Sequence, residues 1–141
     1  MEPQQQCLFC KIVNKEIPSI IINETDDFIT VLDINPANKG HSLIIPKEHI
    51  PFSPLINKEV SDKIAKEIKR LSALFIKELK ARGSSVFVAN GTIAGQRVPH
   101  TVIHVIPRYI DDGLNLIIED KPINKKEIED IYKKFITPKK E

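Results

Sequence analysis

Short runs of β-branched and aromatic residues, separated by polar turns, constrain the fold of this chain most strongly. Such runs are typical of strands, whereas a surface helix repeats its apolar residues at every third or fourth position. The strand pattern occurs at Ile20–Asn23, Phe28–Asp33, His41–Ile45, Ser85–Val88 and His100–Ile106. Only a short polar turn separates the first two runs, so we expect them to form a hairpin.

One long amphipathic segment interrupts these strands. Residues 58–82 place apolar side chains mostly three or four positions apart, and Gly83 predicts where the helix ends. Residues 8–16 predict one or two helical turns before Pro18, and residues 124–136 predict a terminal helix. Strands joined by short turns around one inserted helix indicate an α+β domain with an antiparallel sheet, whose open edge could pair with a partner subunit.

The composition indicates a globular chain. Its 141 residues suit one domain, 41% of them are hydrophobic, and the net charge of +2 gives no strong nucleic-acid signal. The C-terminal end is locally basic through Lys133, Lys134, Lys139 and Lys140, which we interpret as a solvated tail. No apolar run reaches the ~18 residues of a membrane span, and the N-terminus lacks a signal-peptide pattern. We therefore expect a cytoplasmic protein.

The two cysteines form a single C-x-x-C pair, Cys7 and Cys10. Three readings of the pair stay open: two ligands of a metal, two buried thiols, or a redox pair. A tetrahedral zinc needs four ligands, and His49 with one of the histidines of the last predicted strand could supply the other two. The redox reading is weaker because no strand precedes the motif.

The run V-P-H-T-V-I-H-V-I-P-R at residues 98–108 holds two of the four histidines. On a strand, His100, Val102 and His104 point to the same face, because successive side chains alternate. The middle position of this three-residue set is chemically inert.

Four ordered motifs within residues 7–108 resemble those of the histidine triad (HIT) family, of the zinc-containing nucleotide-binding kind. They read C-L-F-C-K-I-V-N-K-E-I-P-S, V-L-D-I-N-P, K-G-H-S-L-I-I-P-K-E-H and A-G-Q-R-V-P-H-T-V-I-H-V-I-P-R. The resemblance implies an α+β HIT-like domain with a five-stranded antiparallel sheet and one long helix, spanning 1–141 with a C-terminal extension at 109–141. It also implies a homodimer with a continuous ten-stranded sheet.

The resemblance further implies site residues. A zinc ion would be held by Cys7, Cys10, His49 and His100. A purine nucleotide would place its ribose on Asp33 and its base near Phe9, Ile12 and Ile34. Its phosphate would meet Gly95, Gln96 and His104, with His41 close to the triad.

The chain departs from the family at the position of the nucleophile. Relatives carry a middle histidine that attacks phosphorus, and here that residue is Val102. Ala89 stands where relatives often carry Asn or Gln facing the phosphate, and the neighbouring Asn90 is expected on the opposite face. Arg97 either adds a positive charge to the site or points to solvent.

These departures predict a nucleotide-binding protein with impaired or absent phosphoramidate or dinucleotide hydrolysis. Two alternatives stay open. The first is an active hydrolase or nucleotidyl transferase that uses water or another residue, and the second is a zinc-stabilised interaction module without enzymatic activity.

Overall fold

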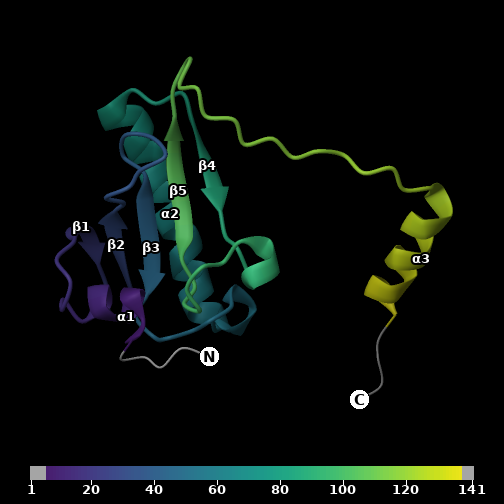
Figure 1. The fold of residues 1–141 in the computed structure, drawn as a ribbon, viewed down its shortest axis with the longest axis horizontal. Helices are drawn as coiled ribbons and strands as arrows, with labels where there is room; N and C mark the ends of the chain where they lie inside the picture. The colour runs from purple at the N-terminus through teal and green to yellow at the C-terminus, as the bar shows by residue number, and fades with distance from the viewer. Residues whose placement is uncertain (1–5, 138–141) are drawn as a thin grey trace.

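The computed structural model describes residues 6–137 and has one five-stranded antiparallel sheet at its centre (Figure 1). The strands are β1 (Ile20–Glu24), β2 (Phe28–Leu32), β3 (Ser42–Pro46), β4 (Gly83–Phe87) and β5 (Ile103–Arg108), in the order β1-β2-β3-β5-β4. The helices are α1 (Leu8–Val13), α2 (Lys58–Leu79) and α3 (Lys125–Ile136), with 3-10 turns η2 (Ser53–Leu55) and η3 (Thr92–Ala94). The predicted fold class is confirmed.

Side-chain alternation along the strands builds a separate core on each face of the sheet. On one face, α2 packs through Leu71 and Phe75 against residues such as Ile44 and Val105. The core on the other face contains Ile29, Val31, Leu43 and Ile45, and it is covered by Phe9, Ile12, Val13 and Val102. Residues 102 and 104 therefore share the α1 face, as the alternation predicts.

The long helix ends earlier than the sequence pattern predicts. Its last residue is Leu79, not Arg82, because Lys80 adopts a left-handed conformation with φ of 58°. The N–H groups of Lys80 and Ala81 both donate to the carbonyl of Phe75. These bonds satisfy a carbonyl in the last turn of the helix. The chain then joins the sheet at once, since Arg82 N–H donates to the carbonyl of Arg108.

Two strands also differ from prediction by two residues or more at an end. β4 covers Gly83–Phe87 and not Ser85–Val88, because its pairing with β5 already begins at Gly83 opposite Arg108. β5 begins at Ile103, so His100 lies in the approach to the strand, where Thr101 N–H donates to the carbonyl of Ile50.

The residues after β5 extend away from the sheet and α2 (Figure 1). The predicted terminal helix is present as α3, which begins at the N-cap Asn124, and every one of its residues is exposed. Lys139 and Lys140 of the predicted basic tail lie outside the described residues. None of the described helices has the length and apolar character needed to cross a membrane.

Candidate functional site

Both cysteines and two histidines form one compact cluster. The Cys10 sulfur lies 3.1 Å from Nδ1 of His49 and 3.4 Å from Nδ1 of His100, and the Cys7 sulfur lies 3.5 Å from the latter atom. Cys7, Cys10 and His100 are buried, and the two thiols are not joined by a disulfide bond. The four candidate ligand atoms all lie within 4.8 Å of one another.

Local structure orients the side chain of each residue in the cluster. Cys7 is the N-cap of α1, where its sulfur accepts a hydrogen bond from the N–H of Cys10. His49 follows the end of β3. His100 Nε2 donates to the carbonyl of Pro46 at 2.8 Å, which leaves the lone pair on Nδ1 facing the sulfurs.

These distances match a tetrahedral metal site. With zinc–sulfur bonds of about 2.3 Å and zinc–nitrogen bonds of about 2.0 Å, tetrahedral angles put sulfur and nitrogen roughly 3.5 Å apart. The observed separations of 3.1 to 3.5 Å are close to that value. The donor set of two thiols and two imidazoles is one that zinc prefers.

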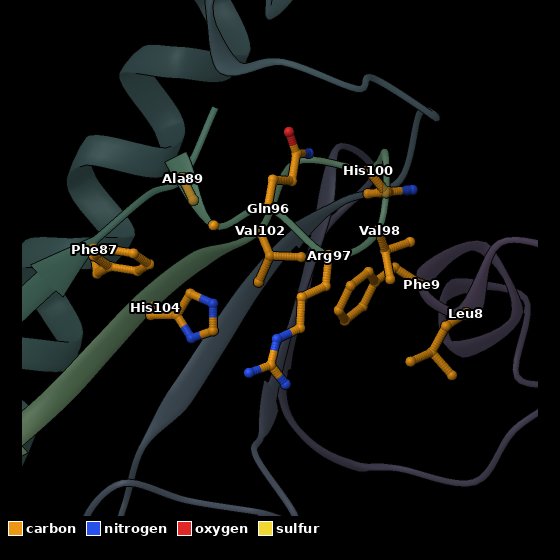
Figure 2. Close-up of a pocket in the computed structure, with 11 residues that line it drawn as sticks. Leu8, Phe9, Phe87, Ala89, Gln96, Arg97, Val98, His100, Val102 and His104 are labelled. Atoms are coloured by element: carbon orange, nitrogen blue, oxygen red, sulfur yellow. The ribbon is translucent and has the colours of Figure 1, made fainter. Parts of the chain in front are cut away.

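A cavity of about 500 Å³ opens on the α1 face of the sheet, beside this cluster (Figure 2). It contains three of the predicted phosphate contacts and one predicted base contact, together with residues of α1, β4 and the loop after η3. Its lining consists of Leu8, Phe9, Phe87, Ala89, Gly95, Gln96, Arg97, Val98, His100, Val102 and His104. Val102 lies between the two histidines in sequence and presents methyl groups to the cavity.

His104 belongs to a hydrogen-bonded pair with a defined proton arrangement. Ala37 N–H donates to Nδ1 of His41 at 3.0 Å, so the His41 proton must be on Nε2. His41 Nε2 lies 3.0 Å from Nδ1 of His104 and therefore donates to it. The remaining proton of a neutral His104 is then on Nε2, and that nitrogen has no lone pair with which to attack phosphorus.

Burial keeps both rings neutral. It lowers the pKa of His41, and the Asp33 carboxylate, 3.7 Å from Nε2, opposes this shift. Burial also lowers the pKa of His104, and the neighbouring His41 adds to the effect. The pair therefore presents neutral imidazoles at pH 7.

Asp33, His41 and His104 also have the residue types of a metal site. The hydrogen bonds disfavour that use. A metal on Nε2 of His41 would need a lone pair there, while the bond from Ala37 already occupies the lone pair on Nδ1. A neutral imidazole has only one such lone pair.

The loop beside the cavity is held by its own amide side chain. Gln96 accepts a hydrogen bond from the N–H of Gly91 at 2.7 Å and donates to the carbonyl of Pro51 at 2.6 Å. Gln96 thus braces the loop in this structure. Arg97 extends along the cavity, and among the described residues it is the one cationic side chain in the lining (Figure 2).

The structure also locates Ala89, predicted as a lost phosphate contact, and its neighbour Asn90. Ala89 lines the cavity with a methyl group. The side chain of Asn90 is directed to Ser53, accepting from Ser53 N–H and donating to Ser53 Oγ, although both residues follow the end of β4 and are not part of the strand.

Other predicted nucleotide contacts lie outside this cavity. Ile34 is 79% exposed in the turn after β2, and Ile12 packs into the core of the α1 face. Asp33 does not line the cavity, but its carboxylate lies 3.7 Å from Nε2 of His41 and within 4.8 Å of a ring nitrogen of His104. Phe87 was not predicted as a site residue, although it lies in a predicted strand. Its ring meets the His104 ring edge-on, with the ring centroids 5.7 Å apart, because the β4–β5 register pairs these two residues.

Comparison with known proteins agrees with this fold. The model of the HIT domain matches residues 14–111, so the chain belongs to the HIT family. It is 42% identical over 108 residues to an uncharacterized HIT-like protein of Methanocaldococcus jannaschii, covering 76% of this chain and 82% of that protein. It is 37% identical over 123 residues to adenosine 5'-monophosphoramidase hnt1 of Schizosaccharomyces pombe, covering 86% and 90%.

Solved structures share the architecture. A HIT family protein of Bacillus subtilis superposes with a TM-score of 0.84 at 29% identity, over 92% of this chain and 94% of its own. A zinc-bound histidine triad family protein of Mycobacterium smegmatis superposes with a TM-score of 0.75 at 32% identity, over 84% and 86%.

Proposed function

We propose that this HIT-family protein binds a purine nucleotide in the cavity on the α1 face and has lost the family's covalent hydrolysis. The observation that carries the proposal is Val102, which lines this cavity at the predicted position of the nucleophile. Support for the ligand class comes from the relative named as an adenosine 5'-monophosphoramidase.

Neither histidine beside Val102 is a suitable replacement. His100 uses Nδ1 toward the cysteines and Nε2 toward Pro46. His104 accepts from His41 at Nδ1 and carries its proton on Nε2. A covalent nucleotidyl intermediate needs a nitrogen lone pair aimed at phosphorus, and this arrangement supplies none.

The same arrangement favours binding of a phosphate. His104 Nε2–H is a donor, Arg97 adds a positive charge, and Gly95 leaves backbone close to the cavity. Donors and a cation around an anion stabilise it where water is partly excluded. Phe9 and Leu8 supply apolar surface on which a purine base can pack.

We also propose that Cys7, Cys10, His49 and His100 hold one zinc ion. All four positions would be filled by protein, so its role would be structural: tying α1 to the end of β3 and the start of β5. The zinc-bound relative from Mycobacterium smegmatis supports this assignment.

An active hydrolase that uses water directly is the second candidate function, and the enzymatic name of the yeast relative favours it. Turnover of an adenosine phosphoramidate separates the two functions, while calorimetric titration with a purine mononucleotide separates both from a pure interaction module. Assembly into a homodimer, the single-domain organisation and a cytoplasmic location stay predictions.

A further inference from the structure

The charge of the cavity on the α1 face depends on one side chain, Arg97. Among the described residues the lining contains no acidic side chain, and Arg97 supplies its one permanent positive charge. The Arg97 guanidinium forms no hydrogen bond or ion pair with another described residue. Arg108, in contrast, pairs with Asp112. A positive charge without a counter-charge from the protein favours an anion in the cavity.

The backbone that carries Arg97 is held in place by its neighbour. The side chain of Gln96 bonds to the N–H of Gly91 and to the carbonyl of Pro51, and the N–H of Gln96 donates to the carbonyl of Gly91. The loop therefore fixes where the Arg97 side chain begins, while the guanidinium keeps all of its donors for a ligand. These five N–H donors form a planar fork that suits the paired oxygens of a phosphoryl group.

A second donor lies deeper in the same cavity. His104 of β5 presents its Nε2–H there, because its Nδ1 accepts from His41. Figure 2 shows the Arg97 side chain extending past Val102 toward the side of the cavity on which the His104 ring lies. His104 is partly buried, whereas Arg97 is exposed. The two donor groups thus come from different elements, one at the floor of the cavity and one at its mouth.

These two groups differ in what they can bind. The single N–H of a neutral imidazole satisfies one oxygen of a phosphoryl group and adds no charge. The guanidinium fork can bind two further oxygens and balances one negative charge. A 5'-monophosphate offers one phosphoryl group to both donors. A 5'-diphosphate offers two linked phosphoryl groups and a greater negative charge, so each donor can bind a phosphoryl group of its own.

We propose that Arg97 determines specificity by making the cavity select a purine nucleoside 5'-diphosphate over the 5'-monophosphate. The α-phosphoryl group meets the Nε2–H of His104, and the β-phosphoryl group reaches the guanidinium at the mouth. Because Val102 cannot attack the α-phosphorus, the diphosphate stays intact. The cavity volume of about 500 Å³ is within the range of about 300–1,000 Å³ found for small-molecule sites. The inference rests on the proposed nucleotide binding and adds the class of nucleotide.

Calorimetric titration of the full, metal-loaded chain in magnesium-free buffer tests this selectivity. Adenosine and guanosine 5'-monophosphates are compared with the corresponding 5'-diphosphates, so that the base preference does not decide the result. For the base that binds better, wild type should bind the diphosphate at least about 10-fold more tightly, a difference of about 1.4 kcal/mol. Arg97→Gln should lower this ratio at least about 5-fold, because it removes both the charge and the fork.

The matched control is Arg82→Gln, which removes the same charge from an exposed side chain outside the cavity. It should keep the ratio within about 2-fold of the wild-type value. A second measurement follows Arg97 itself. Its Nε–H signal in ¹H–¹⁵N NMR spectra, identified by its loss in Arg97→Gln, should shift when the diphosphate is added.

The possible outcomes separate the two levels of the proposal. A wild-type ratio below about 10, a smaller loss of the ratio in Arg97→Gln, or an equal loss in Arg82→Gln would overturn the selectivity and leave nucleotide binding standing. An Arg97 signal that does not respond to the diphosphate would do the same. A wild-type protein that binds none of these nucleotides would overturn both the selectivity and the proposed function.

Discussion

At the scale of single residues, the proton arrangement of the His41–His104 pair decides what the site can do. One backbone N–H, that of Ala37, sets the tautomer of both rings in sequence. The result is a hydrogen-bond donor facing the cavity at His104, next to the apolar side chain of Val102. A site with donors and without a nucleophile binds phosphate more readily than it cleaves a bond to phosphorus.

This arrangement can be measured directly. Long-range ¹H–¹⁵N NMR spectra at pH 7 should show the proton of both rings on Nε2. The titration midpoints of His41 and His104 should lie below the ordinary histidine pKa of about 6.5, because burial disfavours the charged ring. A proton on Nδ1 of His41 would contradict the assignment.

The same shifts predict how stability depends on pH. Since folding lowers both pKa values, the unfolded chain takes up protons at a higher pH than the folded protein does. The free energy of unfolding should therefore fall as the pH drops through about 6.5, and this loss should end below the lowered folded values. Urea unfolding of wild type and His41→Gln between pH 8 and pH 5 checks this, because the variant should show a smaller slope.

Several site residues were predictable from sequence and others were not. Cys7, Cys10, His49 and His100 were predicted as a set from the family motifs, and the structure brings all four together. The bracing role of Gln96 was not predictable, because it depends on how residues 91 and 51 approach each other in space. A local pattern contains no signal for such a contact.

At the scale of elements, α1 depends on the cysteine–histidine cluster. The helix has only six residues and begins at a cluster cysteine. Removing the proposed zinc ion should loosen α1 and the cavity wall that it forms. Protein purified without chelator should contain about one zinc per chain.

Metal removal should also lower stability. A ligand a thousandfold above its dissociation constant stabilises the folded state by about 4 kcal/mol. Thermal unfolding monitored by circular dichroism should therefore show a lower Tm after chelation, with recovery on adding zinc. Cys7→Ser should lose the response, whereas the exposed Ser61→Ala serves as a control. A Tm unaffected by chelation would contradict a structural metal.

Glu67 of α2 forms hydrogen bonds with residues of the sheet. Its buried carboxylate accepts hydrogen bonds from Thr30 and Asn23 on one oxygen and from Arg70 on the other. Burial raises the pKa of Glu67, but these bonds outweigh it and hold the pKa below the usual value.

Glu67→Ala should reduce the free energy of unfolding by about 2–3 kcal/mol, because it strips buried donors of their acceptor. Glu67→Gln should cost less, because an amide oxygen can still accept from Thr30. Equal losses in urea unfolding would contradict this account of the contact.

The ends of the helices depend on contacts that the repeat of apolar residues does not reveal. The repeat of apolar residues predicted α2 and α3, since both have one apolar face. It extended α2 to Arg82, but the buried position of Ala81 and the pairing of Arg82 with Arg108 end the helix at Leu79. Those two contacts are tertiary and leave no trace in helical periodicity.

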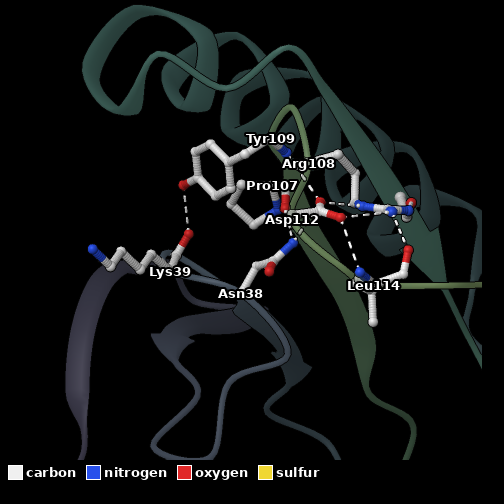
Figure 3. A network of polar contacts seen from close by, with 8 residues as sticks. Asn38, Lys39, Pro107, Arg108, Tyr109, Asp112 and Leu114 are labelled. Atoms are coloured by element: carbon white, nitrogen blue, oxygen red, sulfur yellow. Dashed lines mark hydrogen bonds and ion pairs between the residues drawn. The ribbon is translucent and has the colours of Figure 1, made fainter.

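At the scale of the whole molecule, the sheet and its two cores follow from the strand pattern, while the path of residues 113–136 does not. The direction in which these residues leave β5 depends on Asp112, whose partners come from residues 38, 108, 109 and 114 (Figure 3). Asp112→Ala should release that direction. We expect faster amide hydrogen exchange at Tyr109 and Leu114, whose N–H groups donate to Asp112, with the exposed Asp120→Ala as a control.

The proposed function requires this chain to bind a nucleotide without turning it over, and a paired assay of two proteins measures both properties. Wild type and Val102→His are each assayed for hydrolysis of an adenosine phosphoramidate and titrated with a purine mononucleotide. We predict that both bind at micromolar to millimolar affinity, about −4 to −8 kcal/mol. Wild type should turn over more slowly than about 10⁻³ s⁻¹, and the histidine should raise the rate at least about 100-fold. Wild-type turnover at about 1 s⁻¹ or faster would contradict the account.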